Sequence, residues 1–188
     1  MPAARQGRDD VVAQIFTLIR ERGFDGTSLA DIGAATGLGK SSLYHYFPGG
    51  KDDMAAAVLD HAGRWMQTHA LAALRAPGPP AKRLRAMLRT LDELYAGGTV
   101  ACVLAALALG TGRERVRAGL AGAFTGWIDA LRDLAIEAGI SRAEARERAE
   151  DAVVRIEGAL VLAVSLNDPA PFTRACRHID RDLLRVAA

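Results

Sequence analysis

Apolar residues recur at helical spacing along this 188-residue chain, and no segment alternates apolar and polar residues as a half-buried strand does. The first stripe shows the pattern, with Val11, Ile15 and Ile19 in register. Alanine and leucine are abundant, whereas residues that favour strands are few. Glycines and prolines break the chain between the stripes. We therefore predict an all-α fold of about nine helices, with short ones first and longer ones after.

Three of the later segments carry more specific predictions. Residues 51–75 are expected to form one long helix. Residues 100–109 are apolar on nearly every side, which predicts a helix buried all round. Ser141 followed by Glu144 predicts a complete capping box at the start of another helix.

Two short helices separated by Gly37 are the most informative local pattern. Ser28 followed by Asp31 marks the start of the first short helix, and Gly39 opens the second. Leu43 and Phe47, four residues apart, would form the buried edge of that second helix. A short helix, a glycine turn and a second short helix predict a helix-turn-helix, whose second helix lies in the major groove of DNA.

Gly39-Lys40-Ser41 also resembles the end of a phosphate-binding loop. That loop needs a glycine five residues before its last glycine, and it lies between a strand and a helix. Ala34 occupies the required position, and the preceding segment is predicted to be helical. Both the spacing and the context therefore argue against a nucleotide site.

The side of the second short helix opposite Leu43 and Phe47 carries groups suited to DNA. Lys40 can donate to guanine, serine hydroxyls can reach bases or phosphates, and Tyr44 and His45 offer donors and flat faces. Lys51 begins the next helix and is placed for a phosphate. The net charge of the whole chain is only +2, so DNA binding would depend on a few placed contacts.

Residues 8–66 resemble the TetR (tetracycline-repressor) family of bacterial transcription regulators. The resemblance rests on GFDGTSLADI (residues 23–32), on A-x-GLGKSSLYHYF (residues 35–47) and on Lys51. The variant LYHYFPGGK (residues 43–51) resembles the subgroup of lincomycin-resistance-type repressors, although its turn at residues 48–50 is one residue longer than is common in the family.

The resemblance implies a cytoplasmic homodimeric repressor of palindromic double-stranded operator DNA. It divides the chain into a DNA-binding domain at residues 7–66, with its recognition helix at about 39–46, and a ligand-binding and dimerisation domain at residues 67–188. The residues expected to contact DNA are Thr27, Ser28, Lys40, Ser41, Ser42, Tyr44, His45, Tyr46 and Lys51.

The resemblance also implies a small effector bound in the second domain. Aromatic and polar side chains among aliphatic ones favour a hydrophobic or weakly polar molecule. We hypothesise that such a ligand moves the helix at residues 51–75 and lowers operator affinity. The candidate lining residues are Trp65, Met66, His69, Leu88, Leu91, Tyr95, Leu104, Phe124, Trp127 and Leu131, and the alternative for each is that it fills the core.

The last two predicted helices carry apolar stripes that could pair across a two-fold axis. The resemblance implies a four-helix bundle there, and packing within one subunit is the alternative. The residues of these stripes are Val153, Ile156, Leu160, Val164, Phe172, Cys176, Ile179 and Leu183.

Other features narrow the class of protein. Cys102 and Cys176 lie in apolar patterns, no histidine or cysteine pair has metal-ligand spacing, and no leader or membrane segment is expected. We expect no cofactor and no enzymatic activity. Two alternatives stay open: a DNA-binding regulator without a small-molecule ligand, controlled by a partner or acting as an activator, and an all-helical small-molecule-binding protein or enzyme.

Overall fold

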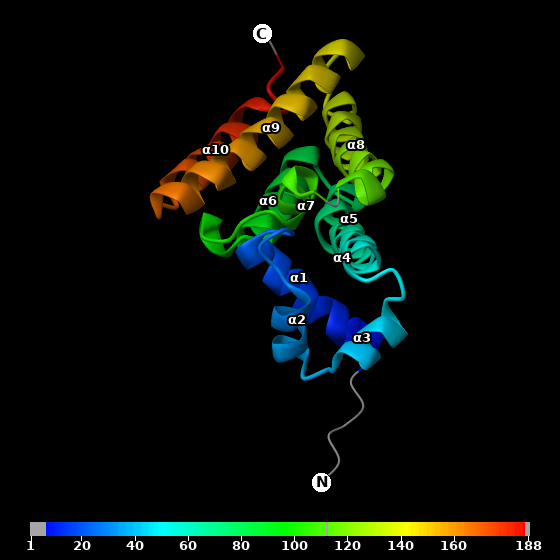
Figure 1. Cartoon of the computed structure of the whole chain (residues 1–188). Helices are drawn as coiled ribbons and strands as arrows, with labels where there is room; N and C mark the ends of the chain where they lie inside the picture. The colour runs from blue at the N-terminus through cyan, green and yellow to red at the C-terminus, as the bar shows by residue number, and fades with distance from the viewer. Residues whose placement is uncertain (1–6, 112, 187–188) are drawn as a thin grey trace. The chain divides into compact units, whose positions relative to one another are not determined.

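Every regular element in the described part of the computed structural model, residues 7–111 and 113–186, is a helix (Figure 1). The prediction of an all-α fold is confirmed. The elements are α1 (Arg8–Arg22), α2 (Leu29–Thr36), α3 (Lys40–Tyr46), α4 (Lys51–Trp65), η1 (Met66–Ala70), α5 (Leu71–Arg75), α6 (Pro80–Leu94), η2 (Ala96–Gly98), α7 (Val103–Leu109), α8 (Arg113–Glu137), α9 (Arg142–Leu166) and α10 (Ala170–Asp182).

The long helix predicted at residues 51–75 is present, but a π-helical turn interrupts it. This turn is η1, which separates α4 from α5. The hydroxyl of Thr68 donates to the carbonyl oxygen of Arg64 at 2.8 Å, and the ring of His69 stacks on Trp65 with centroids 4.8 Å apart. A threonine hydroxyl that competes for an i−4 carbonyl loosens the regular helical ladder.

The contacts between residues divide the chain into two compact units. The first consists of Met1–Gly63 and Val103–Leu120, and thus of α1 to α3, most of α4, α7 and the start of α8. Its interior is apolar and draws on several of these helices. The residues buried there include Val11, Ile15, Ile19, Ile32, Leu43, Phe47, Met54 and Val58.

These units do not coincide with the predicted domains, because the segment from Val103 to Leu120 packs with the first unit.

The prediction that residues 100–109 form a helix buried all round is wrong. The helix begins at Val103, buries Leu104 and Leu107, and leaves Leu109 82% exposed. The alanines of α7 have little apolar surface, so burial of one face is enough to stabilise the helix.

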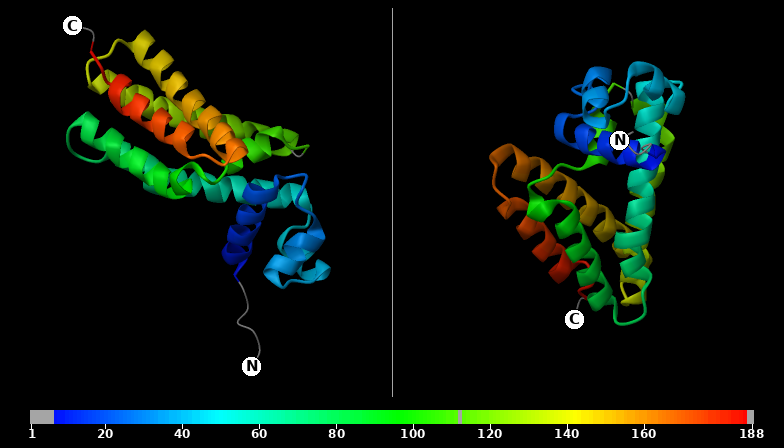
Figure 2. Two further views of the ribbon diagram at one scale, coloured as in Figure 1. Left: turned by 90° about the vertical axis from the view of Figure 1, so that its left-hand side faces the viewer. Right: turned by 90° about the horizontal axis from the view of Figure 1, so that it is seen from below.

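The second unit consists of Arg64–Cys102 and Ala121–Ala188. Its last two helices, α9 and α10, run side by side (Figures 1 and 2). Ile156 of α9 and Phe172 of α10 are fully buried.

The capping box predicted at Ser141 is only half formed. Ser141 Oγ accepts a hydrogen bond from the Glu144 amide, whereas the Glu144 carboxylate pairs with Arg148.

Gly98 ends η2 in a conformation that only glycine adopts easily, with φ at +99°. A Cβ atom placed there would lie 2.6 Å from the Cβ of Phe172. Gly98 thus permits the backbone before α7 to approach α10. Gly139 has a similar φ of +97°, but a Cβ there would meet nothing within 4 Å.

Alanine substitutions at these two glycines distinguish the cost of backbone strain from the cost of steric crowding. We expect Gly139→Ala to lower the free energy of unfolding by about 1–2 kcal/mol through strain alone. Gly98→Ala should lose a further ~1–3 kcal/mol, because the new methyl group overpacks the contact with Phe172. Urea unfolding followed by tryptophan fluorescence measures both losses, and equal losses would contradict the close approach of Gly98 to α10.

Candidate DNA-binding site

The helix α3 has one buried edge and one exposed polar face. Leu43 is 2% exposed and Phe47 just after the helix is fully buried. The guanidinium of Arg8 lies over the Phe47 ring, 5.2 Å from its centre. The side chains on the other side are exposed, as predicted: Lys40, Ser41, Ser42, Tyr44 and His45. Whether they bind DNA is a separate prediction.

The preceding helix α2 is fixed at both ends. Ser28 Oγ accepts a hydrogen bond from the Asp31 amide at 3.1 Å, and the Asp31 carboxylate accepts one from the Ser28 amide at 2.9 Å. The Ser28 hydroxyl also donates to the Asp31 carboxylate, and this bond, followed by the one from the Ser28 amide and by the nearby charge of Arg22, lowers the pKa of Asp31. Gly37, in the left-handed region with φ at +67°, ends the helix. The helix-turn-helix geometry is therefore set by local groups.

Two predicted DNA contacts are held inside the unit in this structure. Thr27 is fully buried, and its hydroxyl donates to the carbonyl oxygen of Gly23 at 2.8 Å. The ammonium of Lys51 donates to the carbonyl oxygen of Phe24 at 2.8 Å and lies 4.4 Å from the centre of the Phe24 ring. A phosphate contact through the Thr27 hydroxyl requires its bond to be given up, whereas the Lys51 ammonium keeps further donors.

The remaining predicted contacts lie at the edges of the helix pair. Ser28 is exposed at the start of α2. Tyr46 is half-buried, and its ring packs edge-on against His45, with centroids 5.7 Å apart. The longer turn after α3 is ordered by the Gly50 amide, which donates to the Phe47 carbonyl at 2.9 Å. The exposed polar groups predicted to contact DNA are thus Ser28 at the start of α2 and the outer face of α3.

Comparison with known proteins identifies the family of this chain. Residues 12–58 match the family model "Bacterial regulatory proteins, tetR family". Residues 80–178 match the model "Transcriptional regulator LmrA/YxaF-like, C-terminal domain". The chain belongs to the TetR family. It is a transcriptional regulator with a helix-turn-helix DNA-binding domain, and the predicted subgroup is confirmed.

Similar proteins extend over nearly the whole of this TetR-family chain. An HTH-type transcriptional regulator of Mycobacterium tuberculosis is 30% identical over 94% of this chain and 93% of its own length. The HTH-type transcriptional regulator LmrA of Bacillus subtilis is 25% identical over 95% of this chain and 96% of its own.

Solved structures agree with the fold. A TetR transcriptional regulator from Legionella pneumophila superposes with a TM-score of 0.84 over 95% of this chain and 98% of its own, at 18% identity. A TetR-family regulator from Agrobacterium tumefaciens gives 0.81 over 93% and 95%, at 26% identity. The helical order seen here is thus the TetR fold.

The residues predicted to line an effector cavity do not share one environment. Leu104 belongs to the first unit, while the other nine belong to the second. Leu91, Trp127 and Leu131 are almost completely buried, whereas His69 is exposed. The partly buried ones are Trp65, Met66 and Phe124, and the remaining buried ones are Leu88 and Tyr95. Their role in ligand binding stays a prediction.

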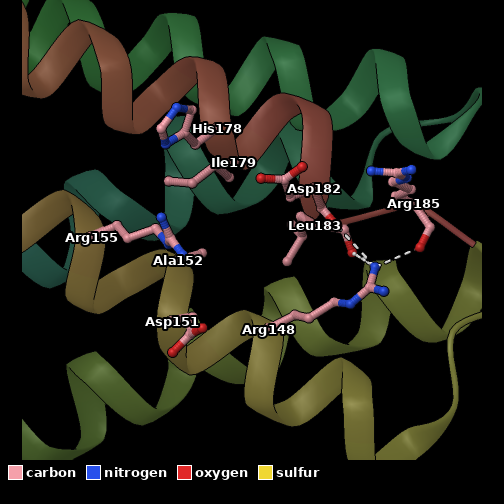
Figure 3. Close-up of a pocket in the computed structure, with 9 residues that line it drawn as sticks. All are labelled: Arg148, Asp151, Ala152, Arg155, His178, Ile179, Asp182, Leu183 and Arg185. Carbon is pink, nitrogen blue, oxygen red and sulfur yellow. Dashed lines mark hydrogen bonds between the residues drawn. The ribbon is translucent and has the colours of Figure 1, made fainter. Parts of the chain in front are cut away.

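A depression of about 270 Å³ lies between α9 and α10, and none of those ten residues lines it (Figure 3). Arg148 closes one end by donating to the carbonyl oxygens of Asp182 and Arg185, at 2.9 and 2.7 Å. Arg155 and His178 also line it. This mixture of charges does not suit the apolar effector predicted from the sequence.

Most residues predicted for a dimer interface are already buried within the chain. They are Val153, Ile156, Leu160, Phe172, Ile179 and Leu183. Cys176 is half-buried, and Val164 is 43% exposed. The interface stays a prediction. A second apolar stripe of α9 is exposed instead, and it consists of Val154, Val161, Leu162 and Leu166.

The two cysteines are free thiols. Burial, together with the charge of Asp92, raises the pKa of Cys176 to about 11, so this thiol carries little thiolate at neutral pH. Among the described residues, no group of three or more His, Cys, Asp or Glu side chains could hold a metal ion. No described helix combines the length and apolarity that a bilayer crossing needs.

Sequence reasoning missed one buried acid, Glu157 of α9. Both carboxylate oxygens are buried, and neither forms a well-aligned hydrogen bond with the described residues. Burial raises the pKa of Glu157, and the nearby thiol of Cys102 opposes this in part. The signal was available: Glu157 is the only charged residue between Arg155 and Asp168.

The raised pKa of Glu157 has a consequence for stability. Between the pKa of the unfolded chain and the higher pKa of the folded one, the folded state binds more protons, so stability falls as pH rises. Glu157→Gln keeps the shape without the charge. We expect this variant to melt at a higher temperature than wild type at pH 8 and to converge with it near pH 4, where both forms are neutral.

Thermal unfolding across this pH range checks the prediction. Glu147→Gln is the matched control, because Glu147 is an exposed acid on the same helix. The prediction is wrong if Glu157→Gln is less stable than wild type at pH 8, because the folded protein would then stabilise the ionised carboxylate.

Proposed function

We propose that this regulator is a cytoplasmic homodimeric repressor that binds palindromic operator DNA and is released by a small hydrophobic or weakly polar effector. Residues 7–66 bind DNA, and residues 67–188 bind the effector and the second subunit. The exposed polar face of α3, held in place by buried Leu43 and Phe47, is the observation that carries the DNA-binding part of this proposal. The family membership supports the rest.

In this proposal α3 enters the major groove with its N-terminal residues toward the bases. Lys40, Ser41 and Ser42 approach base edges, while Tyr44 and His45 contact the sugar-phosphate backbone. Thr27, Ser28, Tyr46 and Lys51 complete the set on the phosphate side. With so small a net charge, the protein depends on these placed contacts for affinity.

The proposed dimer uses the exposed stripe of α9. Val161 and Leu162 lie seven and eight residues after Val154, so the three share a face of the helix. Val164 and Leu166 extend it. A contiguous exposed apolar face is typical of an interaction surface, and a two-fold axis lets the same stripe cover itself. Two recognition helices would then lie about 34–36 Å apart, one turn of DNA.

The proposed effector acts by preferring the conformation that cannot bind the operator. A ligand that binds both conformations equally shifts nothing. The aromatic residues of the second unit, among them Trp65 and Trp127, supply apolar surface with few polar groups. They remain the best candidates for its contacts.

Substitutions on α3 test the DNA-binding proposal. Lys40→Ala and Tyr44→Ala should each weaken binding to the operator by about 1–3 kcal/mol, because each removes a placed contact. The measurement is fluorescence anisotropy with duplexes from the protein's own upstream region, or selected from a random pool, over a salt series. Lys82→Ala is the control, because it removes the same charge from an exposed position of α6.

Equal affinities for wild type, Lys40→Ala and Tyr44→Ala on a selected duplex would overturn the role of α3. Weak binding that does not distinguish between duplexes would overturn operator recognition itself.

A charge on the exposed stripe of α9 tests the dimer. Val161 is 57% exposed in the single chain, so Val161→Arg should leave the subunit folded. We expect it to sediment as a monomer at concentrations where wild type is a dimer, because the arginine would be buried without a partner. Leu109→Arg, at an 82% exposed position of α7, should remain a dimer. A dimeric Val161→Arg variant would place the interface elsewhere.

A further inference from the structure

The loop between α1 and α2 is tied to the turn that precedes α8. The Asp25 carboxylate accepts a hydrogen bond from the Thr111 amide at 3.0 Å and another from the Thr111 hydroxyl. The two residues are 86 positions apart, and both lie in the first unit. These hydrogen bonds hold the pKa of Asp25 below its ordinary value. Donors to an ionised acceptor make stronger hydrogen bonds than donors to a neutral one.

The neighbours of these two residues also touch. A Cβ atom at Gly110 would lie 2.9 Å from the Cβ of Phe24, so the glycine permits this approach. The ammonium of Lys51 lies over the ring of the same Phe24 and bonds to its carbonyl oxygen. Phe24 is 5% exposed. One aromatic side chain thus joins the α1–α2 loop, the start of α4 and the turn after α7.

The same loop leads directly into the helix-turn-helix. Thr27 and Ser28 follow Asp25 within three residues, and Ser28 caps α2. A change in the loop therefore alters where α2 begins and how Lys51 is held. Thr111 is two residues before the start of α8, a helix with residues in both units.

We propose that Asp25 and Thr111 are positioning residues for DNA binding, which clamp the turn before α8 to the loop that starts the helix-turn-helix. This proposal rests on the proposed function. The Asp25–Thr111 clamp keeps α2, and with it α3, in the orientation that binds the operator. It touches no DNA, and it lies where a change in α8 reaches the DNA-binding unit.

The direction in which Asp25→Ala changes DNA affinity distinguishes a clamp from a surface acid without a role. Asp25→Ala removes a negative charge from the DNA-binding unit, which on charge alone leaves DNA affinity unchanged or raises it. If Asp25 is part of a clamp, Asp25→Ala should instead lower operator affinity by about tenfold. Glu21→Gln is the matched control, because it removes a negative charge from an exposed position of α1.

Thr111 supplies a second pair of variants. Thr111→Val keeps the shape and loses the hydroxyl, so operator affinity should fall about three- to tenfold. Thr111→Ser keeps the hydroxyl and should restore affinity to within about twofold. Because neither residue contacts phosphate in this proposal, the slope of affinity against salt should stay that of wild type.

The experiment uses the full-length protein and a duplex selected by wild type from a random pool, with anisotropy over a KCl series. Hydrogen exchange of the free protein is the second readout, and the peptide covering residues 23–28 should exchange faster in Thr111→Val than in wild type.

If no duplex can be selected, the proposed function fails and the clamp fails with it. If a duplex is selected but Asp25→Ala binds it as tightly as Glu21→Gln does, only the clamp is overturned. A changed salt slope in Thr111→Val would likewise overturn it, because the residue would then be contacting DNA.

Discussion

The orientation of α3 depends on the burial of Leu43 and Phe47. A helix of seven residues has little stability of its own, since its few hydrogen bonds barely offset the cost of nucleation. Complete burial of two such side chains contributes about 3–6 kcal/mol. The cation of Arg8 over the Phe47 ring adds to this anchor. The polar face of α3 is exposed because the opposite edge is held inside.

Several charges in the first unit are used for its own structure. Arg22 pairs with Asp31 at 2.8 Å, and Lys51 is held at Phe24. Lys40, by contrast, is exposed at the start of α3. A nearly neutral protein can therefore still present a usable cation where its recognition helix is exposed. We therefore expect the placement of these groups, more than the total charge, to determine the affinity of this surface for DNA.

The sequence was sufficient for the all-α fold because its helices carry apolar stripes, and some of them also carry their own start and stop signals. Ser28 and Gly37 bound α2 through local hydrogen bonds and backbone conformation, which depend only on nearby residues. The exposed face of α3 followed from the spacing of Leu43 and Phe47. These features are local, so a single sequence reveals them.

Contacts between distant residues could not be predicted from the sequence. Spacing showed that Ile156 and Leu160 share a stripe, but not that α10 covers it and leaves Val161 exposed. The hydrogen bond between Lys51 and the Phe24 carbonyl, 27 residues away, could not be foreseen either. Glu157 stands out in the sequence as a lone charge in an apolar stretch, but only the packing shows that its carboxylate is buried. Such facts depend on tertiary packing.

The π-helical turn η1 also affects how this chain aligns with its relatives. A π-turn holds one residue more than the α-helical turn that it replaces, so it is equivalent to an insertion within the helix. Removing one residue between Trp65 and Leu71 would convert this turn into an α-helical one and leave the helix faces on either side in register. Relatives that keep an uninterrupted α-helix here would therefore align with a one-residue gap, and this gap would fall at residues 66–70.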